Sequence, residues 1–254
     1  MATNLLPARA GELARAYAAR RLTGVKFTTA VGSLVVERVF DAMTLVALMA
    51  FAMWRGGFGA DTSVGGVTLG ELARMAAVIA LVGLLLATSF VRWPGPALKI
   101  TRSLGERFLP EKWSVRLVEA AEGVLSGLDA LQSTGRFLAV SFWSLVLWLT
   151  GAASFWLGFV AFGIDVPLTA GLLVQTVLAF GLAIQFSPGF FGQFEAVCRV
   201  TLALYAVAAG PAVSFAFGFH LGGFIPITLL GLWSLSRAHL HLADLRSAEE
   251  DDKA

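Results

Sequence analysis

Ionisable side chains interrupt otherwise apolar stretches of this chain, and these are the residues that could do chemistry. Glu37, Arg38 and Asp41 lie within one apolar run, and Glu195 and Arg199 stand four residues apart between two others. A charge at the centre of a membrane span costs about 2.5 to 3.5 kcal/mol on insertion scales, so such residues are functional candidates. A guanidinium suits a phosphate, which it binds by forked hydrogen bonds, and a carboxylate suits an amine or a proton. The alternative is an ion-pair network that serves only helix packing.

The second chemical feature is a helix break in the sequence Ser187-Pro-Gly-Phe-Phe-Gly-Gln-Phe-Glu195. Pro188 lacks a backbone donor and Gly189 and Gly192 loosen the chain, so backbone polar groups are freed. Such breaks occur at membrane depth only inside protein or beside a water-filled cavity. Half-helices whose positive ends meet an anionic group are a recurring transport site. The alternative is a loop between two spans, in which Glu195 and Arg199 pair across one helix turn.

Composition indicates the class of protein that must position these groups. The chain has 254 residues, of which 57% are hydrophobic and 14% charged, whereas a globular domain carries about 25% charged residues. The sequence therefore predicts an all-α polytopic membrane protein, a helical bundle with broken or re-entrant helices. Cys198 is the only cysteine, which excludes a disulfide framework and a cysteine metal site.

Motifs of other function classes are absent from the sequence. It contains no P-loop, no dinucleotide glycine pattern, no nucleophile elbow and no zinc-ligand spacing. We therefore expect no enzyme activity, no cofactor and no metal. The net charge of +2 gives no indication of nucleic-acid binding, and the first thirty residues contain no signal-peptide apolar region.

Apolar runs of span length predict the order of the membrane segments. Spans are expected at 30–54, 72–91, 137–162 and 212–235, with a loop at 55–71. Another apolar run, at 168–186, lies between the last two of these spans and ends at the break, and a shorter one covers 196–209. Residues 92–136 carry apolar residues at helical spacing among many charges, which predicts an amphipathic connector broken at Pro110 that lies along the membrane surface. The transmembrane domain is thus 1–236, and 237–254 is a charged tail.

Basic residues predict the orientation, because cytoplasmic loops hold the excess of Lys and Arg. Residues 1–30 hold 5 of them, the connector holds 7 and the tail holds 3, so 15 of the 19 fall on one side. That side is predicted to be the cytoplasm, and the tail is then cytoplasmic. Residues 168–209 could form two full spans or one re-entrant hairpin, since both keep the tail on this side.

A short internal repeat relates the two ends of the chain. Pro7, Gly11 and Glu12 resemble Pro188, Gly192 and Glu195. Each motif precedes a short helix and then a long span. The two copies are separated by about 182 residues in the sequence, and at this separation Arg38 of the first copy corresponds to His220 of the second. The predicted orientation makes the copies inverted, and inverted repeats hold their binding site at the midplane interface. Chance similarity between apolar helices is the alternative. The first motif has no preceding apolar run, so we expect the domain to begin upstream of Met1.

Three motifs resemble those of the transmembrane region of lysylphosphatidylglycerol synthase, also called the flippase-like domain. They are Leu6-Pro-Ala-Arg-Ala-Gly-Glu-Leu-Ala-Arg15, Val36-Glu-Arg-Val-Phe-Asp41 and the break motif that ends at Glu195. Their order and spacing cover most of the chain. The family usually has Pro-Gly-Gly-x-Gly in the third motif, so Phe190 departs from the pattern.

The resemblance implies a multi-pass inner-membrane protein that moves or presents a lipid, such as aminoacylated phosphatidylglycerol or another polar-headed lipid. The residues after Arg237 are too few for a soluble synthase domain, so we expect no such domain there and no aminoacyl transfer. The expected partners are membrane lipids, and the alternative function is a non-transporting partner or anchor of a separately encoded lipid-modifying enzyme. Matching positions that would line or brace the lipid path are Arg9, Glu12, Arg15, Glu37, Arg38, Asp41 and Glu195, to which helix spacing adds Arg199. The matching helix-break positions are Pro7, Gly11, Pro188, Gly189 and Gly192.

Overall fold

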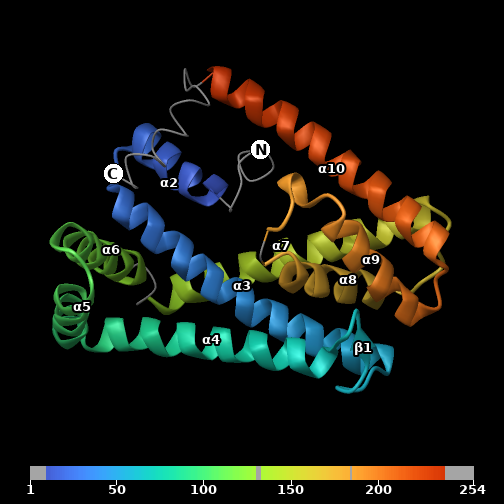
Figure 1. The fold of residues 1–254 in the computed structure, drawn as a ribbon, viewed down its shortest axis with the longest axis horizontal. Helices are drawn as coiled ribbons and strands as arrows, with labels where there is room; N and C mark the ends of the chain where they lie inside the picture. The colour runs from blue at the N-terminus through green and yellow to red at the C-terminus, as the bar shows by residue number, and fades with distance from the viewer. Residues whose placement is uncertain (1–9, 130–132, 184, 238–254) are drawn as a thin grey trace. The chain divides into compact units, whose positions relative to one another are not determined.

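The computed structural model describes residues 10–129, 133–183 and 185–237, and these residues are almost entirely helical (Figure 1). The all-α fold predicted from the sequence is confirmed. The longer helices are α2 (Ala10–Thr23), α3 (Phe27–Gly56), α4 (Leu69–Arg92), α5 (Pro94–Phe108), α6 (Glu111–Asp129), α7 (Thr134–Ala161), α8 (Leu168–Gly181), α9 (Gln193–Leu202) and α10 (Ala209–Arg237). Two short helices, η1 (Pro188–Phe190) and η2 (Ala203–Tyr205), and a hairpin of β1 (Ser63–Val64) and β2 (Val67–Thr68) complete the described part.

The chain divides into two compact units. One contains residues 43–77 and the described residues from 144 onward, together with the start of α2, and the other contains residues 12–42 and 78–143. We call them the C-terminal unit and the connector unit. Helices α3, α4 and α7 each contribute a part to both units. The two predicted candidate motifs therefore fall in different units, since Glu37 belongs to the connector unit and Glu195 to the C-terminal unit.

In the connector unit, the predicted amphipathic connector forms the hairpin of α5 and α6 (Figure 1). Pro110 separates the two helices as predicted. Leu109 before it is extended, with φ −125° and ψ 149°, because a residue that precedes proline is excluded from the helical region. A glycine then lets α6 approach α3, since a Cβ on Gly123 would overlap the Thr28 carbonyl group. This contact fixes the first turn of the helix that carries Glu37.

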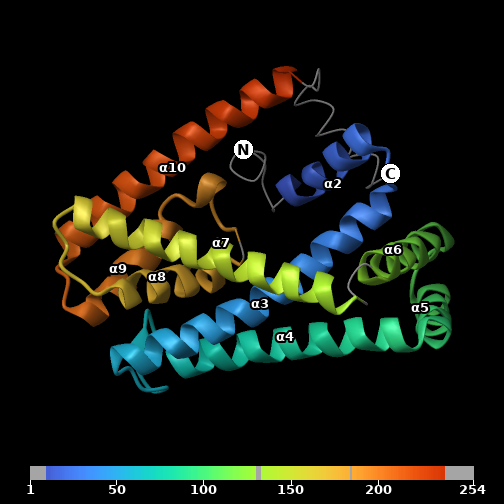
Figure 2. The same cartoon turned by 180° about the vertical axis from the view of Figure 1, so that it is seen from behind.

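In the C-terminal unit, α7, α8, α9 and α10 lie side by side (Figure 2), and their buried side chains form an aromatic core. Phe159 and Phe215 are fully buried in it, with ring centroids 4.6 Å apart. Helices α7 and α8 meet at Gly171, where a Cβ would overlap the Ala152 carbonyl oxygen. The indole N–H of Trp156 donates to the Val166 carbonyl oxygen at 3.2 Å, which ties the loop before α8 to α7.

Three helices are long and apolar enough to cross a membrane, in the part of the chain that the structure describes: Leu69–Leu86 in α4, Thr134–Ala161 in α7 and Ala209–Ser234 in α10. Most of their surface is not covered by the protein. Large apolar side chains such as Leu81, Leu147 and Leu229 are exposed on them, which is unfavourable in water. Helix α3 contains 30 residues and carries the ionisable cluster. Its role as a span at 30–54 stays a prediction.

The helices differ in detail from the apolar run at 168–186 and from the loop predicted at 55–71. The apolar run is an α-helix only as far as Gly181, where α8 ends after 14 residues. At 1.5 Å per residue it is about 21 Å long, which is less than the roughly 30 Å of a bilayer core.

The predicted loop at 55–71 contains the β hairpin, and α4 begins within it at Leu69. Thr68 caps α4, since its backbone N–H donates to Glu71 Oε2 at 2.9 Å and its Oγ1 accepts from the Glu71 N–H at 3.1 Å.

Candidate functional site

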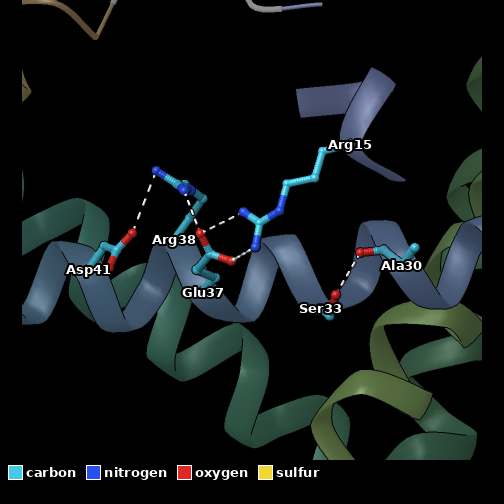
Figure 3. A network of polar contacts seen from close by, with 6 residues as sticks. All are labelled: Arg15, Ala30, Ser33, Glu37, Arg38 and Asp41. Atoms are coloured by element: carbon cyan, nitrogen blue, oxygen red, sulfur yellow. Dashed lines mark hydrogen bonds and ion pairs between the residues drawn. The ribbon is translucent and has the colours of Figure 1, made fainter. Parts of the chain in front are cut away.

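Arg15 of α2 and three residues of α3, Glu37, Arg38 and Asp41, form one cluster, which we call the α3 charge cluster (Figure 3). Arg15 of α2 binds the Glu37 carboxylate through two contacts of 3.0 Å, one from each terminal nitrogen. Arg38 donates to Glu37 Oε1 at 2.8 Å and lies 3.5 Å from Asp41 Oδ2. The sequence placed Arg38 and Asp41 on one helix face, and the structure brings both together with Glu37 and Arg15.

The α3 charge cluster is accessible on its basic side. The Arg15 side chain is 62% exposed and the Arg38 side chain 47% exposed, whereas the Asp41 side chain is only 10% exposed. A guanidinium has five N–H donors in a planar fork. An anionic group can therefore approach the exposed faces of two guanidinium groups that are already oriented by the carboxylates. This arrangement can bind a phosphate or phosphodiester.

The predicted break between α8 and α9 is present, and side chains of the same motif bind its freed backbone groups. Gln193 Nε2 donates to the Gly181 carbonyl at the end of α8 at 2.7 Å, and Gln193 Oε1 accepts from the Phe186 N–H at 3.3 Å. Ser187 Oγ donates to the Phe191 carbonyl oxygen at 2.7 Å. The irregular backbone is thus satisfied by protein, as a break at membrane depth requires.

Left-handed backbone conformations shape this break. Gly189 has φ +63° and Gly192 has φ +82°, values that glycine adopts without a steric penalty. Phe190, the position that departs from the usual motif, has φ +62°. A bulky residue rarely adopts this conformation, so the break keeps the left-handed geometry even where the sequence replaces glycine.

Glu195 and His220 form a second polar site at the start of α9. Gly192 donates its N–H to Glu195 Oε2 at 2.6 Å, which is the glutamate half of a capping box, and Glu195 Oε1 lies 2.7 Å from His220 Nδ1. The side chains of His220 and Glu195 are only 10% and 12% exposed. Arg199, whose pairing with Glu195 was the alternative interpretation of this motif, is exposed one turn further along α9.

The remaining predicted positions are only partly described. Arg9 and Pro7 lie outside the described residues, and Glu12 belongs to α2 with a side chain outside the described part. Gly11 lies inside α2 rather than at a break. The chain interrupts the helix later, at Gly24 with φ +73°, because the residues around Gly11 are good helix formers and a glycine near the first turn is tolerated.

Sequence reasoning missed His220 as a site residue. An imidazole inside an apolar span is an ionisable group, and that signal alone makes it a functional candidate. Its partner Glu195 is 25 residues away in the sequence, so no helix periodicity connects the two.

Comparison with known proteins identifies the family. Residues 1–231 match the model of the lysylphosphatidylglycerol synthase transmembrane region. The chain belongs to this family. It is also similar to the glycosyltransferase AglD of Haloferax volcanii, with 26% identity over 236 residues that cover 84% of this chain and 37% of that protein. The chain therefore spans well under half the length of that relative, and no solved structure matches it.

Membership in the lysylphosphatidylglycerol synthase transmembrane-region family agrees with the exposed apolar helices and establishes a membrane protein of a lipid-related family. The two polar sites lie within the matched residues. In both, ionisable side chains are held by defined partners on otherwise apolar helices.

Proposed function

We propose that this protein moves a polar-headed lipid between the leaflets of the inner membrane, and that the α3 charge cluster contacts its phosphate. The supporting observation is that Arg15 and Arg38 converge on Glu37 with exposed guanidinium groups, on a helix that is otherwise apolar. A surface ion pair contributes little to stability, with a median of about 0 to 1 kcal/mol. Stability alone is therefore a weak reason to place these charges on α3.

The chemistry favours a lipid phosphate over the amine of an aminoacylated head group as the first contact. The carboxylates of Glu37 and Asp41 are already bound by guanidinium groups, whereas the guanidinium faces are accessible. Phosphatidylglycerol and its aminoacylated forms share the phosphodiester. The proposal thus specifies the anionic part of the lipid and leaves the head-group substituent open.

A reconstitution assay tests the proposal. Purified protein is placed in phosphatidylcholine vesicles that contain fluorescent phosphatidylglycerol, and dithionite quenching measures how fast label moves between leaflets. Arg38→Gln removes a charge-assisted contact of about 1.5 to 3 kcal/mol, so the rate should fall at least about tenfold. Arg55→Gln is the matched control on the same helix, because Arg55 lies at the end of α3 beside the Trp54 ring. Equal rates for wild type and Arg38→Gln contradict the proposed role of the cluster.

The second candidate is a membrane partner of a lipid-modifying enzyme that does not itself move lipid. The name of the relative favours it, since the matched region is 37% of a protein called a glycosyltransferase. Copurification of such an enzyme, together with unchanged lipid movement after Arg38→Ala and Glu195→Ala are combined, would support this candidate.

A further inference from the structure

His220 on α10 is enclosed by aromatic rings and a carboxylate. Its ring stacks on Phe191 at 4.6 Å between centroids and lies tilted against Phe194 at 4.5 Å, and the Phe224 ring meets it edge-on at 6.3 Å. Glu195 supplies the polar contact of 2.7 Å to Nδ1. Such an enclosure leaves the imidazole one strong partner, so its protonation state and the position of Glu195 are coupled.

The hydrogen bonds of Glu195 bear on which nitrogen of His220 takes up a proton. Glu195 Oε2 accepts from the Gly192 N–H, and Oε1 faces His220 Nδ1. An ionised carboxylate only accepts hydrogen bonds, so a contact with ionised Glu195 requires a hydrogen on Nδ1. The second ring nitrogen, Nε2, is then the atom whose lone pair takes up a further proton.

The elements packed around the pair carry few other titratable groups. On α9 these are Cys198, which is buried, and Arg199, which is exposed. Helix α8 and residues 144–161 of α7 contain no charged residue, and on α10 the other charged residue is Arg237 at its end. With neutral imidazole the site carries one negative charge in apolar surroundings, and a proton on Nε2 converts it into an ion pair. The faces of Phe191 and Phe194 also favour a cation between them.

We propose that Glu195 and His220 form a proton-binding site that connects the break to α10. Uptake of one proton on Nε2 strengthens two contacts of the His220 ring. One is the contact to Glu195, whose other oxygen accepts from the Gly192 N–H, and the other is the stacking on Phe191 in the break. The break is therefore held more firmly against α10 in the protonated state. If the protein moves lipid as proposed above, proton binding at this site is coupled to lipid movement, and the rate of lipid movement depends on pH. This coupling rests on the proposed function, whereas the proton-binding site does not.

A titration that needs no transport tests the site itself. Histidine labelled with ¹⁵N in the full-length protein in detergent is followed by NMR from about pH 5 to 8, the range in which imidazole exchanges its proton, and His220→Gln assigns the signal. We expect the His220 ring to change protonation in this range, and Glu195→Gln to change the midpoint of that titration. A His220 signal that does not titrate in this range, or one that Glu195→Gln leaves unchanged, overturns the proposal.

The transport assay then tests the coupling. The wild-type rate should change at least about fivefold between pH 5.5 and 8, the lower end of usual coupling between linked sites, and Glu195→Gln and His220→Gln should abolish this dependence. Glu71→Gln is the matched control, because Glu71 also forms a capping box but contacts Thr68 rather than a histidine. If the rate still depends on pH in both Glu195→Gln and His220→Gln, the proposed coupling between this site and lipid movement is refuted. Absence of lipid movement at every pH, with His220 still titrating, refutes the proposed function and leaves the proton site standing.

Discussion

Replacing Gly189 with alanine should destabilise the break for two separate reasons. Gly189 is buried with φ +63°, and a Cβ there would lie 2.8 Å from Phe224 Cε2 and 3.2 Å from Phe191 Cε2. Both rings contact His220. The substitution therefore strains the backbone and also displaces the aromatic rings around the imidazole.

The size of the effect can be estimated from these two contributions. The left-handed conformation costs an alanine about 1 to 2 kcal/mol, and overpacking costs about 1 to 3 kcal/mol, toward the lower end here because the ring ends can shift. The free energy of unfolding should fall by about 2 to 4 kcal/mol. For a chain of this size that lowers Tm by roughly 4 to 16 °C.

Two other glycines separate the contributions. Gly192 has φ +82° with open space around a Cβ, so Gly192→Ala reports the backbone strain alone. Gly222 lies in α10, also with open space, so Gly222→Ala should be neutral or stabilise by up to about 1 kcal/mol. The order of Tm values should then be Gly222→Ala, Gly192→Ala and Gly189→Ala, from highest to lowest.

The chain contains its own reporter for this measurement. Cys198 is the only cysteine and is fully buried in α9, so a dye that becomes fluorescent on reaction with thiols should react only when this region opens. Heating the detergent-purified variants with the dye gives Tm directly. If the Tm of Gly189→Ala equals that of wild type, or is no lower than that of Gly192→Ala, the contacts with the Phe224 and Phe191 rings do not stabilise the break and the reasoning is refuted.

Three further predictions concern packing and topology. Gly171→Ala should lower the free energy of unfolding by about 1 to 3 kcal/mol, because its Cβ would overlap a carbonyl group of α7, and the thiol dye assay measures it. Ala206→Gly should raise Tm, since Ala206 has φ +57° and relief of that strain exceeds the added chain entropy by about 0.5 to 1 kcal/mol. In a Cys198→Ala background, cysteines at the exposed positions Ser63 and Ser103 should react with impermeant thiol reagents from opposite sides of the membrane, and reaction from the same side would refute the predicted orientation.

Local signals predicted much of this fold. The break at Pro110 and the amphipathic helices on either side follow from proline geometry and helical periodicity, and both depend on residues close in sequence. The helix break at Pro188, Gly189 and Gly192 was similarly predicted from the proline and glycine pattern, although its left-handed backbone was not. Contacts between neighbouring residues of one helix, such as Arg38 with Asp41, were also within reach of spacing arguments.

Features that depend on distant partners were not predictable in the same way. The apolar sequence after Gly181 could have continued α8, but the Gln193 side chain binds the Gly181 carbonyl from 12 residues away and the helix ends there. Glu195 turned toward α10 rather than toward Arg199, because the capping box already fixes one carboxylate oxygen and His220 meets the other. Periodicity within one helix contains no information about either contact.

The two ends of the chain repeat one succession of elements, and this bears on where the ionisable groups lie. Helix α2, the left-handed Gly24 and the long α3 are followed 182 residues later by α9 with η2, the left-handed Ala206 and the long α10. At this offset Arg38 corresponds to His220, and each contacts a glutamate, Glu37 or Glu195. A basic group paired with an acid thus recurs at one position of the long helix. An inverted arrangement of the copies stays a prediction, and packing alone does not require a paired base and acid at the same position of both copies.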